Sequence, residues 1–401
     1  MSLSKKPLVK AQYRVPFVLI TTLFFMWGFA HSVLNVLNKH FQEILDITKA
    51  HSALVQATMY MGYFIMAIPA GLFISKYGYR KGVVLGLLLY GIGCLLFIPG
   101  QQLLSFEFFL FSLFVIGCGL TFLETAANPY VTELGDKETA ASRLNLSQSL
   151  NGFGCICAPV LAGYLLFDEH GAKGGNVAVP YIIMGIVVLT AALIFSRVKL
   201  PEIAHEVEID EQGNKVSLWS HKLFIFGAIA LLCYEIGEIS INSFFINYVV
   251  EQKWMGARDA SVILSFGGLG LFMGGRLLGS WIMSRIPAGK MLFICATGTV
   301  VANLIIVMDL GVVSFAALLL NYMFEAIMFP TIFALSLQGL GIHTKRASSI
   351  LMMSPVGGVI GPLLMGTVAD YFPMSIAFVV PLCAYVVVWL YGWKMSKQHV
   401  A

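Results

Sequence analysis

The stretch LETAANPYVTELG, residues 123–135, places a carboxylate among apolar neighbours. Between Phe108 and Thr132, Glu124 is the only side chain with a formal charge. The apolar run is long enough for a helix that crosses a bilayer, which needs about 20 residues. An ionisable group inside a membrane helix is costly, so Glu124 calls for a specific partner or function.

The composition of the whole chain agrees with a membrane protein. Of 401 residues, 58% are hydrophobic and 11% are charged, whereas soluble domains carry about 25% charged residues. The chain lacks the polar surface to face water on all sides, so we expect the lipid bilayer to be its main partner. The net charge of +4 is too small to indicate nucleic acid binding.

The cysteines and the N-terminus indicate neither a disulfide framework nor a cleaved leader. The seven cysteines lie in apolar segments without a His or Cys cluster nearby, so we expect no metal and no cofactor. Four basic residues precede a long apolar run without a small-residue cleavage site. That run is interpreted as a retained first membrane helix.

Twelve apolar segments are long enough to cross a membrane, and they are far longer than barrel strands. We therefore predict twelve transmembrane helices. The segments are 16–38, 52–74, 81–99, 106–131, 144–167, 178–197, 222–249, 259–284, 289–308, 311–338, 347–370 and 374–393.

The distribution of basic residues predicts the orientation. With the N-terminus in the cytoplasm, 19 of the 25 Lys and Arg residues fall on the cytoplasmic side, five fall outside and Arg276 lies within a span. Cytoplasmic loops are enriched in Lys and Arg. Both termini are therefore expected in the cytoplasm, which requires an even number of spans.

A polar stretch, EIAHEVEIDEQGNKVSLWSHK at 202–222, divides the chain near its middle. Weak repeats relate the two sides: Glu124 and Pro129 match Glu325 and Pro330 at an offset of 201. Three further pairs of spans match in the same order. Two such halves predict a substrate site between them, near the middle of the bilayer.

Five charged side chains fall inside predicted spans, namely Glu124, Glu235, Glu238, Arg276 and Glu325. Glu124 and Asn128 are four residues apart and share a helix face. A carboxylate beside an amide can bind sugar hydroxyl groups, and the carboxylate can also carry a proton. A structural hydrogen bond to another helix is the alternative, although an amide would make it at lower cost. Arg276 is expected to pair with a carboxylate.

Polar side chains also recur at helical spacing in three other spans. Amides offer both donors and an acceptor, which suits an uncharged ligand rich in hydroxyl groups. Hydrogen bonding between helices, worth about 0.6 kcal/mol, is the alternative. Trp27 could stack on the apolar face of a sugar. The three sets are His31, Asn35 and Asn38; Asn145, Gln148 and Asn151; and Glu235, Glu238 and Asn242.

The chain contains no Walker A run, no glycine-rich dinucleotide loop and no H-E-x-x-H motif. Transport driven by the chain's own ATP hydrolysis is therefore not expected, and an ion gradient remains. One charge crossing 100 mV supplies about 2.3 kcal/mol, and a tenfold gradient costs about 1.4 kcal/mol. A single coupling cation, H⁺ or Na⁺, can thus sustain more than tenfold accumulation of a neutral solute.

Two kinds of motif resemble a known family. AGLFISKYGYRKG, 70–82, resembles the loop motif of the major facilitator superfamily, with Ser75 where Asp is common. LETAANPYVTELG and RLNLSQSLNGFG, 143–154, resemble the fucose:proton symporter family, which includes bacterial fucose permeases and glucose/galactose transporters. The resemblance covers roughly residues 15 to 395. Further similar stretches are QATMYMGYFIMAIPAG (56–71), GEISINSFFINY (237–248, glucose/galactose branch), MGGRLLGSWIMSR (273–285) and FPTIFALSLQGLG (329–341).

The resemblance implies a transporter that alternates between inward- and outward-open states around a central monosaccharide site. Glu124 matches the membrane glutamate that the family links to proton binding and sugar recognition. Gln148 and Asn151 match residues of the fifth helix that contact sugar. Glu238 matches a glutamate of the glucose/galactose branch.

One position departs from the family pattern. WGFAHSVLNVLNKHF, 27–41, has Asn35 where the family usually carries an Asp that is implicated in protonation. Asn cannot titrate. Either Glu124 alone serves coupling, or Glu238 or Glu325 substitutes, or the ion is Na⁺, or coupling is absent.

The sequence thus predicts an all-α membrane protein of the major facilitator fold, with two pseudo-symmetric six-helix halves at 1–198 and 222–401 and a cytoplasmic linker at 199–221. We expect a monomeric sugar symporter of the cytoplasmic membrane that takes up fucose, glucose or galactose. The predicted coupling residues are Glu124, Glu238 and Glu325. The predicted sugar ligands are Trp27, Asn35, Glu124, Asn128, Gln148, Asn151 and Glu238.

Two alternatives remain at this level. The same fold could carry an amino sugar, a cell-wall sugar or another solute, or could act as an uncoupled uniporter, because fold does not fix substrate. A membrane enzyme would need a nucleophile, base or metal set clustered at one membrane surface. The sequence offers dispersed carboxylates in mid-span instead, so an enzyme is not expected.

Overall fold

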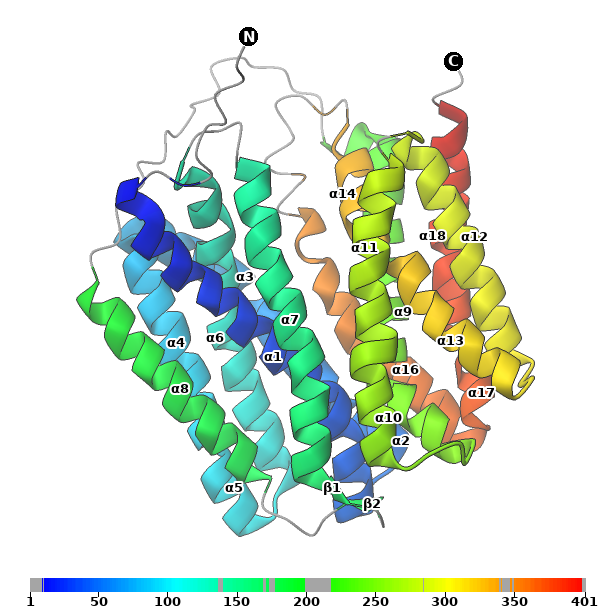
Figure 1. The fold of residues 1–401 in the computed structure, drawn as a ribbon, viewed down its shortest axis with the longest axis horizontal. Helices are drawn as coiled ribbons and strands as arrows, with labels where there is room; N and C mark the ends of the chain where they lie inside the picture. The colour runs from blue at the N-terminus through cyan, green and yellow to red at the C-terminus, as the bar shows by residue number, and fades with distance from the viewer. Residues whose placement is uncertain are drawn as a thin grey trace. The chain divides into compact units, whose positions relative to one another are not determined.

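The computed structural model describes residues 9, 11–135, 140–168, 171–172, 177–198, 218–283, 285–338, 340, 347 and 350–398. These residues are almost entirely helical, as predicted (Figure 1). The helices and strands are η1 (Ala11–Tyr13), α1 (Arg14–Leu45), α2 (Lys49–Ser52), α3 (Leu54–Tyr77), α4 (Tyr79–Leu95), α5 (Phe97–Leu103), α6 (Phe106–Glu133), α7 (Ala140–Leu166), β1 (Phe167–Asp168), β2 (Gly171–Ala172), α8 (Ala178–Arg197), η3 (Leu218–Ser220), α9 (Lys222–Glu251), α10 (Ala257–Ile263), the π-helical turn η4 (Leu264–Leu269), α11 (Gly270–Met283), α12 (Ala288–Val307), α13 (Val312–Glu325), α14 (Met328–Ser336), η6 (Ser354–Val356), α16 (Gly357–Tyr371), α17 (Met374–Ala377) and α18 (Val379–Gln398).

Eleven segments of the described chain are long and apolar enough to cross a membrane, so this is a multi-pass membrane protein. The predicted span 178–197 coincides with α8, and 106–131 lies within α6. The predicted eleventh span, 347–370, corresponds to η6 and α16 and is only partly described. β1 and β2, which pair antiparallel with Phe167 opposite Ala172, were not expected.

The chain forms two compact units that do not follow its order. Unit 1 comprises Met1–Leu34, Thr58–Leu166 and Gly174–Glu206, and unit 2 comprises Asn35–Ala57, Phe167–Lys173 and Val207–Ala401. The boundary therefore cuts α1 after Leu34 and α3 after Ala57. The predicted halves, 1–198 and 222–401, stay a prediction, and residues 199–217 of the predicted linker lie outside the described residues.

In unit 1, glycines allow helices to pack at short distance. α4 lies against α6 and α8 (Figure 1), and a Cβ on Gly119 of α6 would come 2.5 Å from the Tyr90 backbone nitrogen of α4. Between α1 and α7, a Cβ on Gly28 would lie 2.2 Å from the Asn151 carbonyl oxygen. Small residues at such crossings let membrane helices gain van der Waals contact, because lipid supplies no hydrophobic drive between helices.

In unit 2, the end of α1 and the short α2 are held by polar contacts. The Asp370 carboxylate of α16 accepts from the Lys49 and Ala50 backbone N–H groups at 2.7 and 3.0 Å. Lys49 Nζ pairs with Glu251 of α9 at 2.7 Å. Asn38 Nδ2 donates to the Ser243 carbonyl at 2.8 Å. These bonds group residues 35–57 with α9 and α16.

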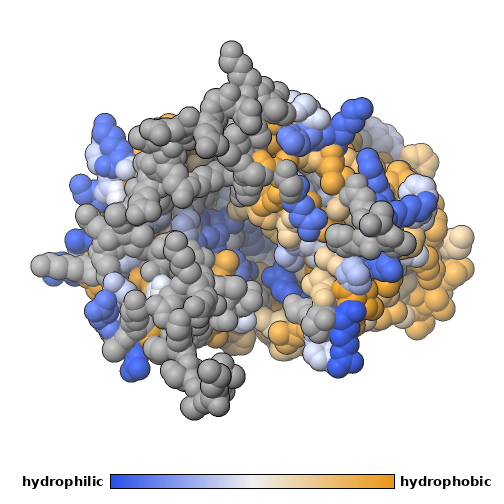
Figure 2. Space-filling view, turned by 90° about the horizontal axis from the view of Figure 1, so that it is seen from above, coloured by the Kyte–Doolittle hydropathy of each residue, from blue (hydrophilic) through white to orange (hydrophobic). Residues whose placement is uncertain are grey.

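The outer faces of many helices are apolar and exposed, as lipid contact requires. Leu72, Leu277 and Val312 are 68%, 71% and 77% exposed. In Figure 2 the flank that carries α12 and α18 is hydrophobic, whereas hydrophilic residues lie at the helix ends turned towards the viewer. In a water-soluble protein such surface would mark an interface, but here the bilayer covers it.

Gly28→Ala is expected to lower the free energy of unfolding by about 1–3 kcal/mol, the usual cost of overpacking. The added Cβ would overlap a backbone oxygen of α7 that cannot rotate away. The thermal unfolding midpoint of the purified protein in detergent measures the effect. Gly71→Ala in α3, where no atom lies within 4 Å of the added Cβ, is the matched control. Equal midpoints for the two variants would contradict the close approach of α1 and α7.

Candidate functional site

Glu124 lies in the middle of α6 and is half-buried. α6 begins at the Ser105 cap, whose side chain accepts from the Phe108 N–H, and continues past Pro129 without a break. Among the described residues, no hydrogen bond or ion pair engages the Glu124 carboxylate, and the Tyr63 hydroxyl lies within Coulombic range of it. An accessible carboxylate without a partner is available to a ligand.

Tyr63, whose hydroxyl lies within Coulombic range of Glu124, belongs to a group of four aromatic or imidazole rings. His31 Nδ1 and Nε2 contact the hydroxyls of Tyr60 and Tyr63 at 3.2 and 2.9 Å. Trp27 meets His31 edge-on, with ring centroids 6.2 Å apart, and contacts the Tyr63 hydroxyl. Both nitrogens of His31 are therefore occupied, and the rings form one wall of α1 and α3.

The predicted amides of α6 and α7 lie next to one another. Gln148 Nε2 donates to Asn128 Oδ1 at 3.5 Å, and Asn151 Nδ2 donates to the Phe24 carbonyl of α1 at 3.2 Å. All three amides are half-buried. The unit 1 cluster is defined as Trp27, His31, Tyr60, Tyr63, Glu124, Asn128, Gln148 and Asn151.

Unit 2 holds a second polar cluster around Glu325, the last residue of α13. Glu325 Oε2 accepts from Asn321 Nδ2 at 2.7 Å and from the Tyr385 hydroxyl of α18 at 2.6 Å. Asn303 Nδ2 of α12 in turn donates to Asn321 Oδ1 at 2.9 Å. Glu325 is 0% exposed, and its Oε1 has no hydrogen-bond partner. A sugar cannot reach this carboxylate without rearrangement.

The predicted tenth span is interrupted next to Glu325. α13 ends at Glu325 and α14 begins at Met328. Pro330 has no N–H to donate to the Ala326 carbonyl, which would be its helical partner. Arg276 Nε of α11 donates to that carbonyl instead, at 3.3 Å. Arg276 therefore contacts backbone at the break, and the carboxylate pairing that the sequence led us to expect stays a prediction.

Glu238 of α9 is the carboxylate in Coulombic range of Arg276, and it is also in Coulombic range of Glu325. Glu238 is half-buried. The Tyr234 hydroxyl lies beside Glu238 but makes no hydrogen bond to it. One turn further along α9, Asn242 Oδ1 accepts from the Tyr322 hydroxyl at 2.9 Å. The unit 2 cluster is defined as Tyr234, Glu238, Asn242, Arg276, Asn303, Asn321, Tyr322, Glu325 and Tyr385.

Asn35 stands one turn after His31 in α1 and is held by another amide. Asn35 belongs to unit 2, is 6% exposed, and accepts from Gln56 Nε2 at 3.0 Å. To bind a sugar it would have to release Gln56, so its role stays a prediction. Glu235 is 8% exposed. The side chain of Asn145 lies outside the described part of the chain.

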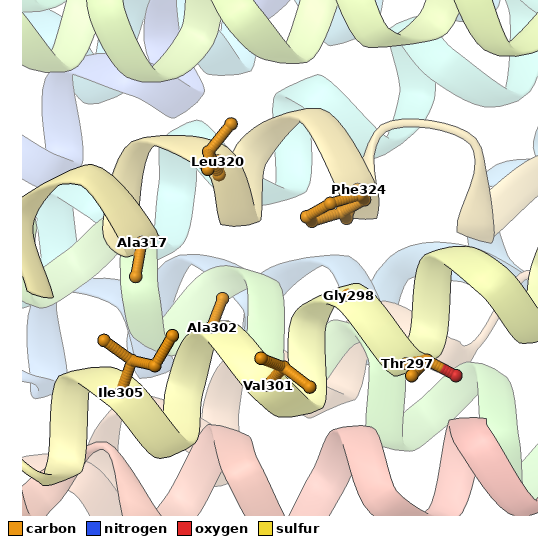
Figure 3. Close-up of a pocket in the computed structure, with 8 residues that line it drawn as sticks. All are labelled: Thr297, Gly298, Val301, Ala302, Ile305, Ala317, Leu320 and Phe324. Atoms are coloured by element: carbon orange, nitrogen blue, oxygen red, sulfur yellow. The ribbon is translucent and has the colours of Figure 1, made fainter. Parts of the chain in front are cut away.

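An apolar cleft of about 240 Å³ lies elsewhere in unit 2, between α12 and α13. Figure 3 shows its lining, which includes Val301, Ala302, Ala317 and Phe324. Its one polar side chain, Thr297, already accepts from Trp389 Nε1. The cleft offers nothing to a hydroxyl-rich ligand and matches the apolar surface that faces lipid.

Several cluster residues were not predicted from the sequence. Tyr60 and Tyr63 were missed although they stand three apart in a predicted span and therefore share a helix face. Asn303, Asn321 and Tyr385 were missed because their polarity is unremarkable until Glu325 is placed beside them. A search for every polar side chain at i, i+3 or i+4 within a span would have found the tyrosine pair and the Asn321–Glu325 pair.

Comparison with known proteins identifies the family. The family model described as "Major Facilitator Superfamily" matches residues 18–354. This chain belongs to the major facilitator superfamily. A "Glucose/galactose transporter" of Brucella abortus biovar 1 is 35% identical over 388 residues, covering 94% of this chain and 93% of the relative. An "L-fucose-proton symporter" of Haemophilus influenzae is 34% identical over 429 residues, covering 97% and 99%.

A solved structure shows the same architecture. The superfamily transporter FucP, in its outward conformation, has a TM-score of 0.70 and 32% sequence identity, with 96% of this chain and 99% of FucP covered. The predicted resemblance and the predicted major facilitator fold are thereby confirmed. The two relatives and FucP are all named as transporters.

Asn151→Asp is expected to lower the free energy of unfolding of this transporter by about 1–3 kcal/mol, because a carboxylate cannot donate to the Phe24 carbonyl. Gln148→Glu is the matched control. It adds the same charge, but the Asn128 amide can rotate and donate to the new carboxylate. Thermal unfolding in detergent compares the two. An equal loss in both variants would mean that charge, and not the bond from Asn151, sets the stability.

Proposed function

We propose that this member of the superfamily takes up a monosaccharide, such as fucose, glucose or galactose, by cation-coupled symport, with H⁺ favoured over Na⁺. The observation that carries the proposal is the half-buried Glu124 carboxylate, which lacks a partner among the described residues and stands beside aromatic and amide side chains. The names of the similar transporters from Brucella abortus and Haemophilus influenzae support it.

The unit 1 cluster has the chemistry that a sugar requires. The Glu124 carboxylate accepts from hydroxyl groups, and the amides of Asn128, Gln148 and Asn151 both donate and accept. Trp27 offers a ring face to the apolar C–H face of a pyranose. Glu238 of unit 2 is a further proposed sugar ligand, since it is half-buried too.

Glu124 also couples the sugar to the cation in this proposal. A carboxylate that binds a proton and hydroxyl groups at one place links their binding free energies. Sugar bound to the protonated form then favours the change between outward- and inward-open states. Glu238 and Glu325 are the other proposed coupling residues.

A uniporter is the second candidate, and Asn35 is the observation that favours it. This amide cannot titrate, and it is engaged by Gln56. A transporter that couples no cation to its sugar equilibrates the sugar but does not accumulate it. An amino sugar or a cell-wall sugar remains an alternative substrate, because the fold does not select one.

The proposed location is the bacterial inner membrane, with both termini in the cytoplasm. Two basic residues of the predicted cytoplasmic side stack on tryptophans, as expected at a membrane interface. Arg285 lies 4.4 Å from the ring centre of Trp281, and Lys397 lies 3.8 Å from that of Trp393. A C-terminal reporter that is active only in the cytoplasm tests this orientation.

Uptake of labelled fucose, glucose, galactose, mannose and N-acetylglucosamine into proteoliposomes tests the proposal, with proton and sodium gradients imposed separately. Accumulation under a proton gradient alone is expected. Accumulation only with sodium would change the ion, and equilibration without accumulation would identify a uniporter. Failure of all five sugars would contradict the proposed substrate class.

Glu124→Gln is expected to lower sugar accumulation at least tenfold, while exchange of sugar across the membrane continues. Gln keeps the shape and can still bind hydroxyl groups, but it cannot carry the proton. Uphill uptake and counterflow are measured on the same proteoliposomes. Glu107→Gln, at an exposed carboxylate near the start of α6, is the control. Normal uphill uptake by Glu124→Gln would remove Glu124 from coupling.

A further inference from the structure

Glu325 is the most completely buried carboxylate among the described residues of unit 2, and its two oxygens differ. Oε2 accepts from Asn321 and from Tyr385, whereas Oε1 is buried without any partner. An ionised carboxylate shares its charge between both oxygens and needs donors on both. In a carboxylic acid the carbonyl oxygen accepts and the other oxygen carries the proton. The observed bonds fit the acid, with Oε2 as its carbonyl oxygen.

The charges around Glu325 lead to the same conclusion. The anionic neighbour in Coulombic range is Glu238 of α9, and the cation in Coulombic range of Glu238 is Arg276 of α11. The other titratable groups nearby are the hydroxyls of Tyr234, Tyr322 and Tyr385, and Glu235 of α9, which is in Coulombic range of Tyr234. Glu238 and Glu325 share one guanidinium, so one of these two negative charges is uncompensated unless a proton is held.

The proton belongs on Glu325 because the two carboxylates differ in surroundings. Glu325 is 0% exposed, and its donors are neutral. Glu238 is half-buried and has the cation. A buried charge without a counter-ion is far costlier than a buried neutral acid. The C-terminal end of a helix, where Glu325 stands in α13, also disfavours an anion.

We propose that Glu325 is a proton-binding site of unit 2, separate from the unit 1 cluster, and that the Glu238–Arg276 pair sets its charge. Release breaks the O–H bond on Oε1, leaves the electron pair on the carboxylate and passes the proton to water. Arg276 also donates to the Ala326 carbonyl next to Glu325, at the break before Pro330, which places the cation of Glu238 close to the released charge. A role for this proton in the transport cycle rests on the proposed function. The experiment below tests proton binding by itself.

Infrared spectroscopy of the purified full-length protein at neutral pH, without sugar, provides that test. The C=O stretch of a protonated carboxylic acid is expected in the wild type and in Glu107→Gln, and is expected to be reduced in Glu325→Gln. Arg276→Gln is expected to strengthen the band, because two carboxylates then lack a cation. Tyr385→Phe is expected to shift it to higher wavenumber, because the C=O group loses a hydrogen bond.

Two results would overturn the proposal. An unchanged band in both Glu325→Gln and Tyr385→Phe would place any protonated carboxyl elsewhere. Loss of the wild-type band when Na⁺ replaces K⁺ would make Glu325 a sodium site. A band that behaves as expected in a protein that moves no sugar would defeat the proposed function and leave this inference standing. Sugar accumulation by a protein that lacks the band would support the proposed function and overturn this inference.

Discussion

Lipid offers no hydrogen-bond partner, and this constraint governs where the protein places its polar side chains. Most of them meet another polar group of the same unit. His31 uses both ring nitrogens on Tyr60 and Tyr63, and Asn321 accepts from Asn303 while it donates to Glu325. Against that background the unfilled acceptors stand out. Some of them are carboxylate oxygens on which the proposals rest: those of Glu124, which are open to a ligand, and Oε1 of Glu325, which is buried.

The two glutamates occupy equivalent places in a sequence repeat but have acquired different surroundings. Each is followed five residues later by a proline, Pro129 or Pro330. α6 continues through its proline, whereas the chain after Glu325 leaves the helix and starts again at Met328. In the second case Arg276 takes the freed carbonyl. We propose that Glu124 recognises sugar and couples it to the cation, whereas Glu325 holds a proton away from sugar, so the two carboxylates of the repeat differ in task.

The sequence predicted the positions of the helices well and the hydrogen-bond partners of their polar side chains poorly. Apolar run length predicted α8 and α6 to within a few residues, because spanning a bilayer fixes a minimum length. Helical spacing predicted that Gln148 and Asn151 share a face of their helix, and the structure adds that this face meets α6 and α1. It could not show that Asn35 bonds Gln56, or that Tyr385 reaches Glu325, because such contacts join residues distant in the chain. Nor could it show that α1 divides between two units, since nothing in the apolar pattern changes at Leu34.

The division of α1 has a consequence for biosynthesis. Lys49 and Asn38 emerge from the ribosome early, but their partners follow 321 and 205 positions later, at Asp370 and Ser243. During that interval the end of α1 and all of α2 lack the groups of α9 and α16 that bind them in the folded protein. A chain truncated after unit 1's last helix would leave these donors permanently unmatched. The polar contacts of this early segment are therefore complete only once α16 has been made.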